Sequence, residues 1–91
     1  MSSIVIFITY NGRHKQELSI NDNESIRYLM SQIFTKFNIS GENYDKQYFT
    51  LTNANTFLNA DEDWLNKTIK DGGIEEDDTI DLKDAGSVQW G

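Results

Sequence analysis

The C-terminal end of the chain holds the residues with the clearest chemical potential. It reads Ser87-Val88-Gln89-Trp90-Gly91 and follows a strand-like segment, Thr79-Ile80-Asp81-Leu82. Because glycine has no Cβ, a terminal glycine can lie extended in a narrow channel, and its carbonyl can be attacked from either face. Either a partner enzyme activates the Gly91 carboxylate and joins it to an amine or hydroxyl, or the terminal glycine is there by chance. Trp90 is either a mark that this enzyme reads or an apolar residue that folds back onto the sheet.

The rest of the chain offers no chemistry of its own. There is no cysteine, so there is no disulfide, thiolate metal site or nucleophilic thiol. The one histidine, His14, lies in a predicted turn without a second metal ligand nearby and is expected to be exposed. No Ser-His-Asp arrangement, glycine-rich phosphate loop or carboxylate pair around an apolar pocket is present. We predict a protein that is not an enzyme, with no catalytic residue, metal or cofactor.

Composition further narrows the class of protein to which the chain could belong. The chain has 91 residues, a hydrophobic content of 37% and a net charge of −7, which together favour one packed domain over a disordered acidic chain. The excess of acids disfavours nucleic acid as a partner. The apolar run 4–8 is too short for a signal peptide, and no segment reaches membrane-spanning length. We expect a cytoplasmic protein.

Acidic residues are concentrated in the C-terminal third. Ten of the fifteen acids fall between Asp61 and Asp84, and four of them form the block 75–78. Such a run is either a solvated loop that keeps the protein soluble or a docking surface for a basic partner.

A helix is predicted between residues 26 and 37. Its apolar residues follow a 3.6-residue period: Ile26, Leu29, Met30, Ile33, Phe34 and Phe37. Asn23 and Ser25 are both candidate N-caps, and the segment 38–41 supplies the stop.

Strands are predicted on both sides of this helix. The segments 4–10 and 17–20 form a hairpin around Asn11-Gly12, and the segments 47–52 and 79–82 follow the helix, with a short strand possible between 53 and 63. Gly72 and Gly73 suit the tight turn before the last strand.

These elements predict one helix packed on one sheet. A single apolar helix stripe needs a single apolar sheet face, which alternate strand residues supply: Leu18, Ile20, Phe49, Leu51, Ile80 and Leu82. The fold class is α+β, a β-grasp with a mixed sheet of four to five strands, in which the first and last strands are central and parallel. Residues 1–83 form the domain, and residues 84–91 form a flexible tail.

The first strand is apolar on both faces. Counting from the Gly12 turn places Val5 and Phe7 under the helix and leaves Ile4, Ile6 and Ile8 on the open face. Three aligned isoleucines there would form a small partner-binding or weak self-association patch, in an otherwise monomeric protein. The alternative is that a central strand carries β-branched residues on both faces through propensity alone.

Two ungapped segments resemble ubiquitin and its relatives. Ser25-Ile26-Arg27-Tyr28-Leu29-Met30-Ser31-Gln32-Ile33 is similar to the ubiquitin helix, and the strand Leu18-Ser19-Ile20 keeps the same distance from it. The segment 68–82 is similar to the ubiquitin turn and final strand. The resemblance covers residues 4–82 and implies the ubiquitin-like form of the β-grasp.

The chain departs from ubiquitin at two places. The positions that match the aliphatic recognition patch of ubiquitin are Thr50 and Lys83, neither of which is aliphatic. The terminus keeps one glycine, Gly91, where ubiquitin has two glycines preceded by basic residues. If partners read this chain, the resemblance implies that they use another face.

The resemblance implies a protein modifier. An adenylating enzyme would activate Gly91, a cysteine carrier enzyme would take it as a thioester, and an isopeptide bond to a target would form. A deconjugating protease would remove it, and the pathway would be a bacterial ubiquitination-like one. The chain also resembles the YukD-like proteins of type VII secretion systems, through Tyr10-Asn11-Gly12 and Asp78-Thr79-Ile80, which implies instead an unconjugated accessory or docking domain. A sulfur carrier is a third reading that the single glycine disfavours. Residues 84–91 favour the modifier.

Overall fold

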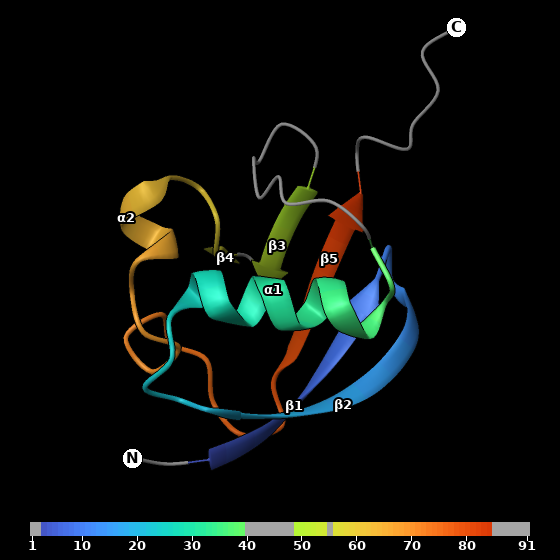
Figure 1. The fold of residues 1–91 in the computed structure, drawn as a ribbon, viewed down its shortest axis with the longest axis horizontal. Helices are drawn as coiled ribbons and strands as arrows, with labels where there is room; N and C mark the ends of the chain where they lie inside the picture. The colour runs from blue at the N-terminus through green and yellow to red at the C-terminus, as the bar shows by residue number, and fades with distance from the viewer. Residues whose placement is uncertain (1–2, 40–48, 55, 85–91) are drawn as a thin grey trace, which may run out of the picture.

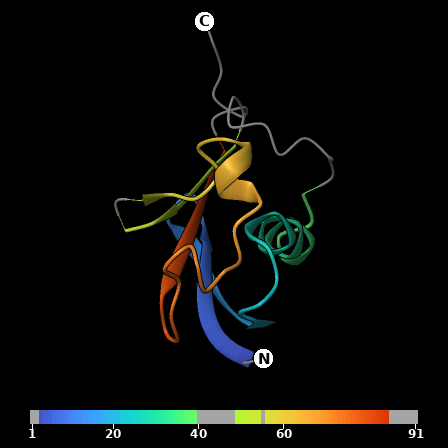
Figure 2. The ribbon, with the colours of Figure 1, turned by 90° about the vertical axis from the view of Figure 1, so that its left-hand side faces the viewer.

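The computed structural model describes residues 3–39, 49–54 and 56–84. The elements in chain order are β1 Ser3–Tyr10, β2 Arg13–Asn21, α1 Ile26–Lys36, β3 Phe49–Asn53, β4 Thr56–Phe57, α2 Glu62–Leu65 and β5 Thr79–Asp84 (Figure 1). Helix α1 crosses one face of the sheet and leaves the other face without a helix (Figure 2).

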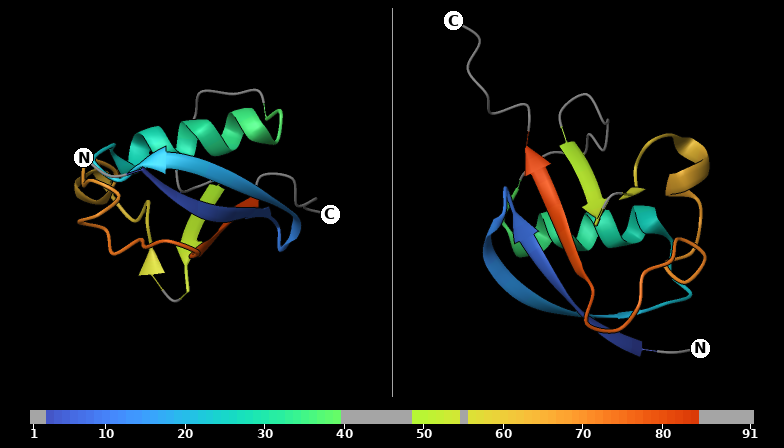
Figure 3. Two further views of the ribbon diagram at one scale, coloured as in Figure 1. Left: turned by 90° about the horizontal axis from the view of Figure 1, so that it is seen from below. Right: turned by 180° about the vertical axis from the view of Figure 1, so that it is seen from behind.

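The sheet has five strands in the order β2-β1-β5-β3-β4. The central pair, β1 and β5, is parallel, while β2 runs antiparallel to β1 and β3 runs antiparallel to both β5 and β4. The face without α1 is seen from behind in the right panel of Figure 3. The predicted α+β fold class, a β-grasp with central parallel first and last strands, is confirmed. The short helix α2 lies where only a polar connection with a short strand was predicted.

Helix α1 begins at the second of its two candidate caps. The Oγ atom of Ser25 accepts a hydrogen bond from the amide of Tyr28 at 3.0 Å, which satisfies one of the unpaired donors of the first turn. Asn23 lies earlier, and its own amide donates to Oδ1 of Asn21 at 2.9 Å. The helix ends at Lys36, and Asn38 takes a positive φ of 56°, as expected for a stop signal.

The core lies between α1 and the sheet. The helix contributes five buried residues, and the sheet face contributes alternate residues of β1, β2, β3 and β5. The fully buried side chains are Ile6, Ile8, Ile26, Leu29, Met30, Ile33, Leu51, Leu58, Ile69, Ile80 and Leu82. The predicted helix stripe is confirmed, except that Phe37 is the C-cap residue and is only partly buried.

The predicted phase of β1 is wrong. Ile6 and Ile8 are 0% exposed and lie in the core, and Ile4 packs against the same core, whereas Val5 and Phe7 are only half-buried. Ile6 pairs with Leu18 across β1 and β2, and residues that face each other in a pair lie on the same side of the sheet. The three isoleucines therefore do not form an open-face patch.

A β-bulge explains the reversal. The turn pairs Tyr10 with Arg13, but the next pair joins Ile8 to Gln16, so β2 uses one residue more than β1. His14 lies in this bulge with a positive φ of 58°. One extra residue in one strand moves every later side chain of the pair to the opposite face, and a count from the turn that assumes a regular ladder gives the wrong phase.

The segment before β5 is held by its turn and by β1. Gly73 has a φ of 82°, Ile74 returns to the core with 3% exposure, and a Cβ on Gly72 would lie 3.0 Å from Cδ1 of Ile26. The amide of Asp77 donates to the carbonyl of Val5 at 2.8 Å. The acidic block 75–78 is therefore fixed beside the N-terminal end of β1.

Candidate partner-binding surface

The sheet face that α1 does not cover is largely polar. Strand alternation and the registers of the pairs place these side chains on it: Val5, Phe7, Lys15, Glu17, Thr50, Thr52, Phe57, Thr79, Asp81 and Lys83. Near β2, Nζ of Lys15 lies 4.5 Å from the centre of the Phe7 ring. This cation–π contact partly covers the aromatic ring on the β1–β2 side of the face.

Asp81 ties the first hairpin to the last strand. Its Oδ1 atom accepts hydrogen bonds from the hydroxyl of Thr9 at 2.6 Å and from the amide of Gly12 at 2.8 Å. The amide of Asn11 donates to the carbonyl of Leu82 at 2.8 Å. These contacts fix the end of β5 next to the β1–β2 turn.

Thr50 and Lys83, which match the recognition patch of ubiquitin in sequence, are direct neighbours across β3 and β5. The adjacent pair on the same face is Thr52 with Asp81. None of the four side chains is aliphatic in the sense of isoleucine, leucine or valine. This part of the face is therefore polar, in contrast to the aliphatic recognition patch of ubiquitin.

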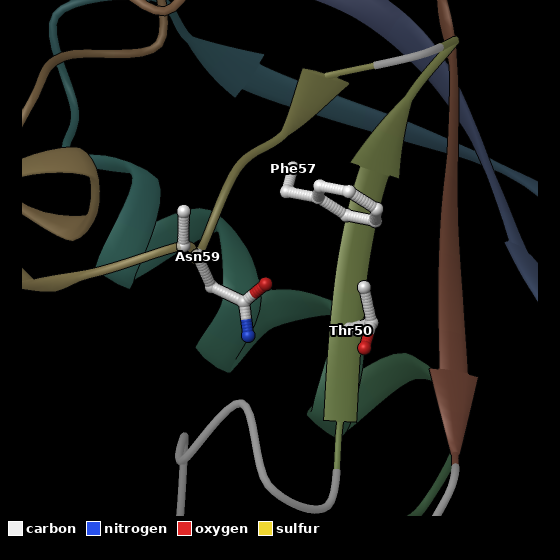
Figure 4. A pocket seen from close by; sticks show the side chains of 4 residues that line it. Thr50, Phe57 and Asn59 are labelled. Atoms are coloured by element: carbon white, nitrogen blue, oxygen red, sulfur yellow. The ribbon is translucent and has the colours of Figure 1, made fainter.

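Phe57 in β4 is an exposed apolar residue of this face, whereas Val5 and Phe7 are half-buried. The Phe57 side chain is 57% exposed, and the residue pairs with Thr52 of β3. With Thr50, Asn59 and Ala60, Phe57 lines a hollow of about 230 Å³ at the β4 edge, where its ring lies over β3 (Figure 4). We call these four residues the Phe57 hollow.

Asn59 completes the edge of the sheet beside this hollow. Its side chain is buried in the gap where β4 has ended; Oδ1 accepts from the amide of Leu51 at 3.0 Å, and Nδ2 donates to the carbonyl of Phe49 at 2.9 Å. The side-chain amide thus takes the place of further strand pairing and satisfies edge groups of β3. Sequence reasoning missed Asn59 and Phe57 as site residues, and a polar residue directly after the apolar pair 57–58 was the only available signal.

Acidic residues flank the β3–β4 hairpin that carries the Phe57 hollow. On one side, Nδ2 of Asn53 donates to Oδ2 of Asp78 at 3.1 Å, which joins the β3–β4 hairpin to the acidic block. On the other side, Ala60 leads into Asp61, the N-cap of α2, and then into Glu62 and Asp63.

The charged residues of α2 and its flanks differ in whether their side chains have partners. Oδ1 of Asp61 accepts from the amide of Trp64 at 3.0 Å, and Glu62 forms an ion pair with Arg27 of α1. Asp63 is exposed, and no ion pair of its side chain is found within the described residues. Trp64 packs against the edge of the core, and Nζ of Lys67 lies 4.4 Å from the centre of its ring.

A second hollow lies beside the β1–β2 turn. Tyr10, Asn11, Arg13 and His14 line its volume of about 340 Å³. His14 is exposed, as predicted. Within residues 3–39, 49–54 and 56–84, no group of three or more His, Cys, Asp or Glu side chains is arranged to hold a metal ion.

Within the described residues, the predicted partner-binding isoleucines do not form a surface site. Ile6 and Ile8 belong to the core, Ile4 is half-buried beside it, and Trp90 and Gly91 lie outside the described residues. The surface that the structure presents instead is the Phe57 hollow.

Comparison with solved structures identifies the fold. The ubiquitin-like domain of Arabidopsis thaliana protein At2g32350 superposes with a TM-score of 0.71 at 14% identity, covering 100% of this chain and 85% of that one. Caldiarchaeum subterraneum ubiquitin gives 0.70 at 15% identity, covering 99% and 100%. A structure described as molecular mimicry of SUMO that promotes DNA repair gives 0.70 at 16% identity, covering 90% and 91%.

Sequence comparison adds no assignment, since neither a family model nor a curated protein matches the chain. The class is thus defined by the fold, which is ubiquitin-like. Among the described helices, none has the length and apolar character needed to cross a bilayer.

Proposed function

We propose that the chain is a ubiquitin-like protein modifier whose terminal Gly91 is activated by an adenylating enzyme and conjugated to target proteins. The observation that supports this most is the anchoring of β5. This central strand pairs with β1 as far as Leu82 and with β3 as far as Asp84. A reactive terminus that follows such a strand would be attached to a rigid globule at a fixed point, which lets a partner enzyme position it by gripping the globule.

In the proposed reaction, a Gly91 carboxylate oxygen attacks the α-phosphate of ATP, and pyrophosphate leaves. A cysteine thiolate of the adenylating enzyme or of a carrier then attacks the acyl carbon and displaces AMP. Finally, a lysine amine of the target displaces the thiolate and forms an isopeptide bond. The nucleophiles that attack the acyl group belong to partners, and a deconjugating protease would hydrolyse the isopeptide bond, giving back the free Gly91 carboxylate and the lysine amine. The setting proposed is a cytoplasmic, bacterial ubiquitination-like pathway.

The test mixes the chain with its cognate adenylating enzyme. With ATP, the chain should form an adduct that thiol reductant and hydroxylamine release. Deletion of Gly91 should abolish the adduct while circular dichroism and thermal unfolding stay unchanged. Lys36→Ala, an exposed change on α1, is the matched control and should react normally. Equal adduct formation by the deletion variant contradicts the proposal.

The second candidate is an unconjugated docking domain, of the kind that the YukD-like resemblance implies. The Phe57 hollow favours it, since an exposed aromatic beside a concave surface suits recognition by a partner whether or not the terminus reacts. Failure of the adduct assay together with retained partner binding would support this candidate over the modifier.

A further inference from the structure

We propose that the Phe57 hollow docks a basic, apolar segment of a partner protein. A large aliphatic or aromatic side chain of that segment would enter the hollow, and lysine or arginine residues beside it would face the acidic residues of α2 and of the segment next to the β3–β4 hairpin. The site does not involve the chain terminus, and the proposal stands or falls independently of conjugation.

Phe57 differs from Tyr28, the other exposed large hydrophobic residue described, in polarity and in exposed fraction. Among the described residues, the large hydrophobic side chains with substantial exposure are Tyr28, at 41%, and Phe57, at 57%. Tyr28 carries a hydroxyl that water can solvate, whereas Phe57 is entirely hydrocarbon. Leaving such a side chain in water forfeits burial free energy, and contact with a partner would recover it.

The hollow is held in place before any partner arrives. Phe57 pairs with Thr52, and the amide of Leu58 donates to the carbonyl of Leu51 at 2.7 Å. Asn59 is 2% exposed and is fixed by its two bonds to β3. A pre-formed surface loses little conformational freedom on binding, which favours its use as a docking site.

The lining favours an apolar occupant. The side-chain oxygen and nitrogen of Asn59 are both engaged with the β3 backbone. The Phe57 ring and the methyl groups of Thr50 and Ala60 supply hydrocarbon surface. An aliphatic or aromatic side chain gains from contact with such a lining, whereas an amide or a charged group would give up hydrogen bonds to water without full replacement.

The charged residues near the hollow favour basic residues in the partner segment, on either side of the docked side chain. Asp78 is joined to the β3–β4 hairpin through Asn53, and the amide of exposed Glu75 donates to the same Asp78 carboxylate at 2.9 Å. Exposed Asp63 lies on the α2 side. Lys83, cross-strand from Thr50, is the basic neighbour on the β5 side. Positive residues of the partner are therefore expected toward β4 and α2, which fixes the orientation of the segment.

The experiment selects ligands without assuming their identity. The full chain is immobilised, a displayed library of random linear peptides is selected on it, and the consensus peptide is synthesised. We expect an aromatic or large aliphatic residue flanked by lysine or arginine. Affinity is then measured by fluorescence anisotropy at low and high salt.

Variants separate the hydrophobic and electrostatic contributions. Phe57→Ser should weaken the peptide by about tenfold or more, whereas Tyr28→Ser should not. The double variant Glu75→Lys, Asp63→Lys should weaken it severalfold and reduce the salt dependence. Glu17→Lys, on the same face at the opposite edge of the sheet, is the matched charge control and should bind like the unaltered chain.

A map of amide chemical shifts on the unaltered chain keeps the test independent of any folding defect. The shifts should be centred on residues 50–60 and on the segment 75–78. A failed selection, an acidic consensus, unchanged affinity in Phe57→Ser, or shifts centred elsewhere would overturn the proposal. Sedimentation that shows a dimer sensitive to Phe57→Ser would also overturn it, because a second copy would then be the occupant.

Discussion

The two faces of β1 carry similar residues and have different roles. Ile6 and Ile8 point toward α1 and are fully buried, while Val5 and Phe7 point to the uncovered face and are half-buried. Hydrophobicity does not distinguish the faces, since all four residues are apolar. The register with β2 does, and the bulge at His14 sets that register. In a central strand, the backbone of the neighbouring hairpin therefore decides which residues form the core.

The strongest test of this comparison reverses the polarity of one residue on each face. Ile6→Glu should abolish folding, because an unpaired carboxylate in the core costs several kcal/mol against a total stability of about 5–15 kcal/mol. Phe7→Thr should cost about 1–2 kcal/mol, for part of the ring burial and for the contact with Lys15. Circular dichroism and urea unfolding measure both. A folded Ile6→Glu variant would instead indicate that Ile6 lies on the open face of the sheet, as the count from the Gly12 turn predicted.

Truncation in the helix gives the next largest effect. Leu29 and Ile33 are 0% exposed against the sheet. Changing either to alanine should lower the free energy of unfolding by about 2–5 kcal/mol, through lost burial and a residual cavity. Lys36→Ala is the exposed control on the same helix. A loss below about 1 kcal/mol in either core variant would show that the helix face is misassigned.

Asn59 tests the edge of the β3–β4 hairpin. Asn59→Ala should cost about 1–3 kcal/mol, because it leaves the amide of Leu51 and the carbonyl of Phe49 without their side-chain partners. Asn23→Ala, an exposed change before α1, should cost about 0.5 kcal/mol or less. Hydrogen exchange at Leu51 should speed up in the first variant alone, and equal effects of the two changes would be inconsistent with an edge-closing role.

The bulge itself gives the smallest expected effect. His14→Gly should raise stability by a few tenths to about 1 kcal/mol, because glycine adopts a positive φ without a Cβ penalty. His14→Val should lower it by about 1–2 kcal/mol, since a β-branched side chain is strained there. Thermal unfolding compares the two. The opposite order of melting temperatures would mean that residue 14 is not held in the left-handed region.

The periodic parts of the fold could be predicted from sequence. The α1 stripe repeats over three turns, its cap at Ser25 is a hydroxyl residue placed directly before it, and Asn11-Gly12 favours a hairpin turn. Parallel pairing of the first and last strands followed from the antiparallel hairpins on either side, which leave the two ends of the domain as neighbours in the sheet.

The remaining features depend on effects that leave little trace in a single sequence. A histidine in a β-bulge has no sequence signature comparable to that of glycine. The bulge could therefore not be predicted, and the side chains of β1 were assigned to the wrong faces. Helix α2 spans only Glu62–Leu65, too short to display a helical period. The exposure of Phe57 depends on where β4 ends and on how Asn59 closes the edge, which are tertiary features. Trp90 and Gly91 lie outside the described residues, and their roles remain predictions.

The central claim of conjugation through Gly91 is tested most directly on proteins isolated from the native host. Lys83 is the last basic residue of the chain, so trypsin should leave residues 84–91 attached to any modified target. Mass spectrometry should then find target peptides whose lysine carries this segment in an isopeptide bond to Gly91. Recovery of residues 84–91 only as linear peptides, across conditions in which the protein is abundant, would contradict the account.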